Sequence, residues 1–565
     1  MSLNIARSFG HLHFLAVTKS VPIALSARPE PYPCAFSRFT ALGASLLGLL
    51  LSAVYVSERW AVFTFTLCAT FTILGLLDLH QTRHSVRRNY PIIGRLRWLF
   101  EEIRPEIRQY LIESDDDQTR FSRAQRSLVY VRAKDEVSDR PFGTRADVYR
   151  NGYEFISHST KPKLQADPDT FRVAIGSAGS GSQYLASMFN ISAMSFGSLS
   201  ANAIRALNKG AKLGNFAHDS GEGGISRYHR EHGGDLIWEI GSGYFGCRTR
   251  NGHFDPTKFA DQASDPQVKM IEIKLSQGAK PGHGGILPGE KVTSEIAESR
   301  GIPIGVDCIS PAEHSAFGNP LEMMEFIAQL RALSKQKPVG FKLCVGHPWE
   351  FMGMVKAMRE TEIYPDFIVV DGAEGGTGAA PVEFADNIGM PLRESLLFVH
   401  NTLVGAGIRD RVKIGAAGKI VSAFDIAAVL GLGADWTNAG RGFMFALGCI
   451  QSLSCHTNRC PVGVATQDPL RQRALVVPAK AERVRRFHHY TLRALAEMTA
   501  AAGLSHPSEI GPHHLVRRVS LTEIRLFSQL HMFLEEGELL TGSHDRDFYS
   551  AAWKLARADR FELAS

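Results

Sequence analysis

The chain has 565 residues, of which 44% are hydrophobic and 21% charged, so it is long enough for one large globular domain with additional segments. Much of its net charge of +6 lies between Arg83 and Arg132. No RNP motif, zinc finger or long Lys/Arg run accompanies that charge, which argues against a nucleic-acid-binding protein. Eight cysteines are too few for a fold held together by disulfides.

Two uncharged stretches near the N-terminus predict a transmembrane helical hairpin. Residues 39–57 give 19 uncharged positions, residues 60–77 give 18, and only Glu58 and Arg59 separate them. Each stretch approaches the roughly 20 residues that cross a hydrocarbon core. A cleaved signal peptide and a hairpin buried inside a soluble protein are the alternatives.

Basic residues predict how this hairpin is oriented. They flank both stretches, whereas Arg59 alone lies between them. The positive-inside rule then places both flanks, and the catalytic domain with them, in the cytoplasm. We expect a cytoplasmic N-terminal segment over 1–38, the hairpin over 39–77 and a juxtamembrane connector over 78–140. Within the connector, 95–114 has helical spacing and 113–134 reads as a polar surface stretch.

Short β-rich runs alternate with helical segments from about residue 170 onward, which predicts parallel strands joined by crossover helices. The runs are 269–275, 302–310, 338–345, 366–372, 411–418 and 434–440. Their number, over roughly 300 residues, fits a (β/α)8 TIM barrel. A doubly wound sheet is the alternative, but it would carry a GxGxxG turn after its first strand, and none follows the first of these runs.

Polar residues and glycines gather where these runs end, and such ends converge at the mouth of a barrel. Lys274 and Lys342 lie at the ends of two runs. Glycine-rich ends allow backbone N–H groups to approach an anion closely. Gly418, and Gly440 with Arg441, follow the last two predicted strands, where barrels often bind phosphate. The pattern predicts a phosphorylated cofactor; solvated charges on the barrel rim are the simpler alternative.

Three of the eight cysteines, Cys449, Cys455 and Cys460, fall within twelve residues. A structural zinc site usually has four protein ligands, often in C-x2-C pairs, and no fourth cysteine lies close by. His456 directly follows Cys455, which would strain a shared tetrahedron. Three thiolates suit an iron–sulfur cluster with three irons, although the spacing alone leaves zinc open.

The segment around these cysteines, "ALGCIQSLSCHTNRCPVGVATQDP", resembles the cluster segment of glutamate synthase, a flavin-dependent enzyme. Five further segments occur in that family's order: "SAMSFGSLS" (192–200), "DSGEGG" (219–224), "SQGAKPGHGGILPGEKV" (276–292), "GGTGAAP" (375–381) and "GLGADWTNAGRGFMFALGC" (431–449). The resemblance covers roughly residues 140–510.

This resemblance implies a barrel over 141–510 that binds FMN at its mouth and a [3Fe-4S] cluster at segment 449–460. The residues it assigns to FMN are Ser195, Lys342, Gly376, Gly418, Gly440 and Arg441. The cluster ligands it implies are Cys449, Cys455 and Cys460. It places Glu222, Lys280 and Arg300 where the family binds 2-oxoglutarate, with Lys280 and Arg300 as cations for the substrate. We expect Lys274 and Glu222 to be catalytic, since a strand-end lysine can stabilise the charge that flavin N1 gains on reduction.

The sequence departs from the family at several points. We expect neither the glutaminase domain nor the C-terminal β-helix, and residues 511–565 read as a helical extension. His283 and Ile286 stand where the family typically has Glu and Gln, so a contact to 2-oxoglutarate is lost or replaced. Segment 310–317 places Glu313 and His314 near the site.

The resulting interpretation is a membrane-tethered FMN and [3Fe-4S] oxidoreductase that reduces an imine of 2-oxoglutarate to L-glutamate. A separate electron donor protein and a separate ammonia or amine source would serve it. The alternatives are a related enzyme acting on another keto acid or amine, and a non-catalytic electron-carrier subunit.

Overall fold

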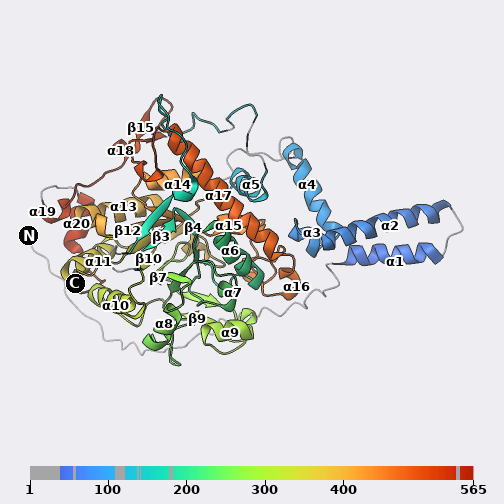
Figure 1. Cartoon of the computed structure of the whole chain (residues 1–565), viewed down its shortest axis with the longest axis horizontal. Coiled ribbons are helices and arrows are strands. Elements are labelled where there is room, and N and C mark those ends of the chain that lie inside the picture. The colour runs from blue at the N-terminus through green and yellow to red at the C-terminus, as the bar shows by residue number, and fades with distance from the viewer. Residues whose placement is uncertain are drawn as a thin grey trace, which may run out of the picture.

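The computed structural model describes residues 39–54, 59–107, 121–136, 139, 141–144, 146–176, 182–542 and 547–563. Within these ranges, eight parallel strands close into one barrel, in the order β10-β11-β12-β13-β4-β5-β6-β7 (Figure 1). The predicted (β/α)8 barrel is therefore confirmed.

The barrel strands are β4 (Phe189–Ile191), β5 (His218–Asp219), β6 (Leu236–Ile240), β7 (Val268–Lys274), β10 (Val339–Leu343), β11 (Phe367–Asp371), β12 (Lys413–Ala417) and β13 (Trp436–Ala439). The helices around them are α6 (Ala201–Gly214), α7 (Arg227–Arg230), α8 (Pro256–Ala263), α9 (Ser294–Arg300), α10 (Pro320–Leu333), α11 (Pro348–Thr361), α12 (Val382–Asn387), α13 (Leu392–Gly405), α14 (Ala423–Leu430) and α15 (Arg441–Leu447). Helices cover the outside and side chains fill the inside, so the strands are buried on both faces and read as apolar runs.

Five of the six predicted strands belong to the barrel, and the prediction for 302–310 is wrong. Only β9 (Cys308–Ser310) is extended there, and it pairs antiparallel with β8 (Gly285–Leu287) in a separate two-stranded sheet. Strands β4, β5 and β6 were not predicted; β4 and β5 have only three and two residues, too few to show a period, whereas β6 has five. A GxGxxG match at 241–246 follows β6, but it lies in a closed barrel and not in a doubly wound sheet.

A hairpin of β2 (Arg172–Ile175) and β3 (Tyr184–Ser187) supplies a second, smaller core. Ile175 and Ala186 pack there with apolar side chains of barrel strands, among them Ile237, Met270 and Trp436. These side chains lie in the amino-terminal halves of their strands, so the hairpin covers the amino-terminal end of the barrel. The opposite end, where the strands finish, carries the polar residues.

The N-terminal helices α1 (Thr40–Val54) and α2 (Arg59–His80) lie side by side and project away from the barrel (Figure 1). The Thr72 hydroxyl donates to the Ser45 hydroxyl across them at 3.2 Å. One stretch, Val62–His80, is long and apolar enough to cross a membrane. A signal sequence or the core helix of a soluble protein can have the same length and composition. The apolar part of α1, Thr40–Ser52, is shorter. Residues 1–38 and 55–58 lie outside the described ranges, so the two-span topology stays a prediction.

The connector contains α3 (Ser85–Asn89), α4 (Ile93–Ile107) and α5 (Arg123–Lys134). Helix α4 confirms the helical spacing over residues 95–107, and residues 108–114 lie outside the described ranges. The expected polar surface stretch is wrong for α5, which buries Val129 and Ala133 where it packs on α17 (Val477–Ala501) and α15. A capping box between Ser122 and Gln125 begins this helix.

The predicted helical extension over 511–565 is also wrong at its start. Strands β14 (Leu515–Arg518) and β15 (Ile524–Leu526) form an antiparallel sheet with β1 (Glu154–Ile156). Glu154, largely buried, accepts from Arg517 at 2.7 Å and also pairs with Arg393, which ties this sheet to α13. Four short helices complete the fold: α16 (Pro469–Gln472), α18 (Phe527–Leu530), α19 (Glu538–Thr541) and α20 (Asp547–Leu555).

Candidate active site at the mouth of the barrel

A small pocket opens at the carboxyl-terminal end of β7, between the ends of neighbouring strands and the loop that holds β8 and β9. Its walls include the predicted residues Glu222, Lys274 and Lys280. The other lining residues are Ser242, Leu275, Ser276, Gln277, Gly282, Gly284, Pro311 and Ala312. The fold therefore brings three of the four predicted catalytic and substrate residues to one pocket.

Two lysines and one carboxylate set the charge of this pocket. Lys274 Nζ lies 2.8 Å from Glu222 Oε1. Burial opposes ionisation of Glu222, but the Lys274 ammonium outweighs it, with smaller help from Lys280 and Arg300, and lowers the pKa of Glu222 to about 2. Burial, reinforced by Lys274, lowers the pKa of Lys280. Glu222 is therefore ionised at neutral pH, and the pocket keeps one cation in excess.

His314 contacts the end of β7 at Lys274. This contact agrees with the expectation that segment 310–317 lies near the site. His314 Nε2 is 2.8 Å from the Lys274 carbonyl oxygen, and its Nδ1 is 3.1 Å from the Tyr244 hydroxyl. Burial lowers the pKa of His314 to about 4. A neutral imidazole that donates to the carbonyl fixes the end of β7 without adding charge.

Arg300, at the end of α9, is 5% exposed and does not line the pocket. Its Nη2 donates to the Phe196 carbonyl at 3.3 Å and lies 3.5 Å from Ser195 Oγ. Its guanidinium also lies over the ring of Phe245, 5.2 Å from the centroid. These contacts hold the loop after β4, in which Ser195 itself is buried.

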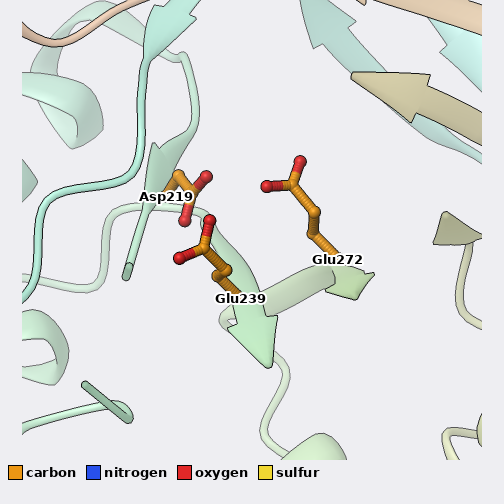
Figure 2. A group of neighbouring side chains, drawn as sticks. All are labelled: Asp219, Glu239 and Glu272. Carbon is orange, nitrogen blue, oxygen red and sulfur yellow. The ribbon is translucent and has the colours of Figure 1, made fainter. Parts of the chain in front are cut away.

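Inside the barrel, Lys342 lies among acidic side chains. Asp219, Glu239 and Glu272 come from β5, β6 and β7, and their carboxylates surround a common space (Figure 2). Lys342 Nζ, from β10, contacts Glu239 most closely and lies 3.1 Å from Glu272 Oε1. Burial, reinforced by Asp219, holds the pKa of Glu272 well above its usual range. The lysine therefore fills the position that a cation would otherwise take.

The acidic cluster has one signal in the sequence. Glu272 and Lys274 alternate with apolar residues along β7, so both point into the barrel. Glu239 has the same place in β6. A charged residue inside a buried run indicates an inward-facing polar cluster.

The loops after β7 and β11 touch backbone to backbone at Gly278. A Cβ at this position would overlap the Gly372 carbonyl oxygen and come within 3.0 Å of the Gly375 backbone. The Gly278 amide also donates to Asp371 Oδ2 at 2.7 Å. These contacts fix one side of the mouth.

Gly278→Ala is therefore expected to separate the two loops and destabilise the fold by about 1–3 kcal/mol, as overpacking does. Thermal unfolding of the purified protein measures it. Gly346→Ala is the matched control, because its Cβ would meet no atom within 4 Å. Equal melting temperatures for both variants would show that the loops are not held in this way.

The other residues predicted to hold the cofactor lie around the same mouth. Gly418 follows β12, Gly440 follows β13, and Gly376 lies in the loop after β11. Arg441 donates to the Glu374 carbonyl at 2.6 Å, and its guanidinium lies 4.7 Å from the centroid of the Phe121 ring. Arg441 thus joins the loop after β11 to the connector.

The three predicted cluster ligands lie on residues 448–462, which we term the cysteine loop, between α15 and α16. Cys460 is buried, and Cys449 and Cys455 are half-buried. Burial, with smaller effects of the other two thiols, raises the pKa of Cys449 to about 12. Among the described residues, the acidic trio of the barrel is the one group whose ligand atoms all lie within 4.8 Å, so the three thiols are spread more widely than ligands of a single ion.

Three residues that the sequence did not single out hold the cysteine loop. Lys291 Nζ donates to the Cys455 carbonyl at 2.8 Å, and the Tyr130 hydroxyl donates to the Cys449 carbonyl at 2.6 Å. Asn89 Nδ2 adds a bond to the Pro461 carbonyl at 3.1 Å. Lys291 lies in the motif 276–292, but Tyr130 and Asn89 belong to the connector and carried no signal.

The conserved region in glutamate synthase matches residues 144–505 of this chain. The chain belongs to the glutamate synthase family. It is 38% identical over 505 residues to the glutamate synthase large subunit-like protein YerD of Bacillus subtilis, covering 82% of this chain and 96% of that one. It is 34% identical over 338 residues to the archaeal-type glutamate synthase (NADPH) of Thermotoga neapolitana, covering 59% of this chain and 63% of that one.

A third relative in the family is the glutamate synthase (NADPH) large chain of Bacillus subtilis, 33% identical over 344 residues. Those residues are 58% of this chain and 21% of that one. The chain thus matches almost the whole of the YerD protein but less than two thirds of these synthases. Membership of the family implies a barrel oxidoreductase.

Proposed function

We propose that this protein is a membrane-tethered FMN and [3Fe-4S] oxidoreductase of the glutamate synthase type, reducing an imine of 2-oxoglutarate to L-glutamate. The observation that carries the proposal is the lysine-lined pocket at the end of β7, in a chain whose residues 144–505 match the family. Two ammonium groups against one carboxylate leave a site that favours an anionic substrate.

The residues at the barrel mouth suit FMN. Gly418 and Gly440 end β12 and β13, the two strands whose loops often bind phosphate in this fold. A Cβ at Gly440 would meet Met194 Sδ and Ser192 Cβ only at 3.8 Å, so neighbouring atoms do not crowd this backbone. Ser195, Gly376 and Arg441 would complete the site, and Lys342 would supply positive charge to the bound flavin.

The cysteine loop suits a multi-iron cluster better than a single ion, because its thiols are spread and are drawn from one loop. Cys449, Cys455 and Cys460 would be the ligands, one for each iron. When bound, FMN would supply hydride transfer and the cluster one-electron transfer. Lys291, fixed to the Cys455 carbonyl, would offset negative charge there.

Within the pocket, Lys280 would bind a substrate carboxylate. Glu222 is ionised and paired with Lys274, so Glu222 cannot act as a proton donor at neutral pH. Reduction of an imine places hydride on carbon and needs one proton on nitrogen, which Lys274 would supply. Glu222 pairs with the Lys274 ammonium, and His314 donates to the Lys274 carbonyl, so both hold Lys274 in place. Arg300 would act as a positioning residue for the Ser195 loop.

A separate electron donor protein and a separate source of ammonia or an amine would complete the reaction. Helix α2 supports a membrane tether, with the barrel in the cytoplasm if the basic flanks set the orientation. The two-span hairpin is part of this proposal.

Anaerobic purification followed by cofactor identification and a substrate screen tests the proposal. We expect FMN, iron and labile sulfide, and reoxidation of the reduced flavin by 2-oxoglutarate with ammonia. Reoxidation by a different keto acid or amine would redirect the assignment to a related enzyme, an outcome that His283 and Ile286 in the substrate motif keep open. Bound cofactors with no reoxidation by any keto acid would point to an electron carrier.

Lys280→Met is expected to raise the KM for the keto acid by roughly 10- to 150-fold, the range for loss of a hydrogen bond to a charged group, while kcat changes little. Steady-state kinetics with an artificial reductant measures both constants. Lys258→Met, at an exposed position on α8, is the control and should leave KM unchanged. An unchanged KM for Lys280→Met would remove Lys280 from the substrate site.

A further inference from the structure

A second pocket lies outside the barrel, where the connector helices meet α17 and the cysteine loop. Its lining residues are Arg83, His84, Ser85, Val86, Arg97, Trp98, Glu101, Arg123, Arg126, Ser127, Tyr130, Lys134, Gly448, Ile450, Val462, Lys480 and Arg483. None of them belongs to the proposed substrate or FMN site. Gly448, Ile450 and Val462 belong to the cysteine loop, so the pocket borders the proposed cluster site but not the substrate or flavin site.

Positive charge dominates this pocket, with seven Lys or Arg residues against one Glu. That single acid, Glu101, already lies 3.5 Å from Arg97 and 3.4 Å from Arg123. Over the ranges that the structure describes, Arg126 has no carboxylate partner, and its Nε is buried without a hydrogen bond. Lys134 pairs with Glu136, which lies outside the lining, at 3.5 Å, so among the described residues the unbalanced cations include Arg126 and Lys480.

Lys480 is the most buried cation of this pocket, with only 1% of the residue exposed. Lysine is almost never so buried unless it is paired, yet no described carboxylate reaches it. Burial, reinforced by Arg483 and Lys134, lowers its pKa well below the usual value. A buried ammonium beside two other cations is unfavourable unless an anion joins them.

The Lys480 ammonium also lies directly over the start of the cysteine loop. Gly448 has φ +112°, and a Cβ there would be 3.1 Å from Lys480 Nζ. The backbone thus carries no side chain between the ammonium and the pocket. Trp98, Tyr130, Ile450 and Val462 form an apolar wall beside the cations.

We propose that this pocket binds a phosphate-bearing anion, held by Lys480, Arg126 and the surrounding arginines. Phosphate forms strong charge-assisted hydrogen bonds with guanidinium and ammonium groups, and it would supply the missing negative charge. The connector helices that form one wall follow directly after apolar helix α2 (Figure 1). An acidic phospholipid headgroup and a free phosphate compound share this chemistry, and the experiment distinguishes them.

The test measures the melting temperature of the full-length protein in neutral detergent with three additions: inorganic phosphate, phosphatidylglycerol or phosphatidylcholine. Lys480→Met and Arg126→Met remove cations of the pocket. Lys212→Met, at an exposed position on α6, is the matched control. Lys480→Met should fold, because it replaces an unpaired buried charge with an apolar chain of similar length.

A rise in melting temperature with phosphate and phosphatidylglycerol, but not with phosphatidylcholine, would support the proposal. A rise with phosphatidylglycerol alone would assign the site to a lipid headgroup. We expect Lys480→Met and Arg126→Met each to weaken the response by about 10-fold in apparent Kd, and Lys212→Met to keep it. No response in the unaltered protein, or a response that both pocket variants retain, would overturn the proposal.

Discussion

Replacing Cys455 with alanine is expected to remove bound iron from the protein almost completely while leaving the barrel folded and FMN bound. Cys455 starts a one-turn helix, Cys455–Thr457, that belongs to no barrel strand. Lys291 Nζ donates a hydrogen bond to the Cys455 carbonyl oxygen, and the substitution leaves this backbone contact in place. Loss of one of three ligands exposes an iron of the cluster and favours its release. Metal and sulfide analysis after anaerobic purification, with far-UV circular dichroism, measures both effects.

Cys68→Ala is the matched control, since Cys68 lies in α2 and not in the cysteine loop. The control should keep about three irons per chain, as the family cluster requires. Iron unchanged in the Cys455 variant, or zinc found in place of iron, would contradict the cluster assignment.

Lys342→Met is expected to destabilise the protein by about 3–5 kcal/mol, the range for removing one partner of a buried ion pair. The substitution leaves Glu239 and its acidic neighbours inside the barrel without their cation. Denaturant unfolding of the full chain measures the change, and Lys335→Met, at an exposed position after α10, should change little. The double variant Lys342→Met with Glu239→Gln should recover part of the loss. A single variant as stable as the unaltered protein would show that the acids are already neutral.

The raised pKa of Glu272 adds a pH dependence with a definite sign. The folded state keeps a proton on Glu272 at pH values where the unfolded chain has lost it. The stability from this group is therefore present below the ordinary carboxyl pKa and is lost as pH rises through the higher folded value. Glu272→Gln, which stays neutral, should match the unaltered protein in acid and become the more stable of the two as pH increases. Parallel melting curves for both across pH would contradict this.

The barrel could be predicted because its later strands are long and apolar and alternate with helical segments. β7, β10, β11 and β12 each show this pattern, and the polar residues at their ends mark the mouth. The early strands could not be predicted in the same way, since β5 has only two residues and its position depends on pairing with β4 and β6. The run at 302–310 has strand composition, yet most of it forms a loop beside β9.

The sequence predicted which residues line the candidate site but not the hydrogen bonds that hold its loops. Motifs placed Glu222, Lys274 and Lys280 together, and the fold brings them to one pocket. Tyr130 and Asn89, two partners of the cysteine loop, were not predicted because they lie more than 300 positions from the loop residues they contact. Helix α5 is rich in polar residues, so its sequence does not show which face is buried. Its packing against α17 is visible only in the tertiary structure.

The packing of α5 determines where the protein can be shortened for expression without its apolar helices. A version that starts after Lys134 would lose the Tyr130 bond to Cys449, the Phe121 ring beneath Arg441, and the cover that Val129 provides. Such a version would leave the cysteine loop open, and the proposed cluster would be exposed to solvent and oxygen. A version that starts before Phe121 keeps all three contacts. The oxygen sensitivity of two such truncations would show how far the connector protects the proposed cluster.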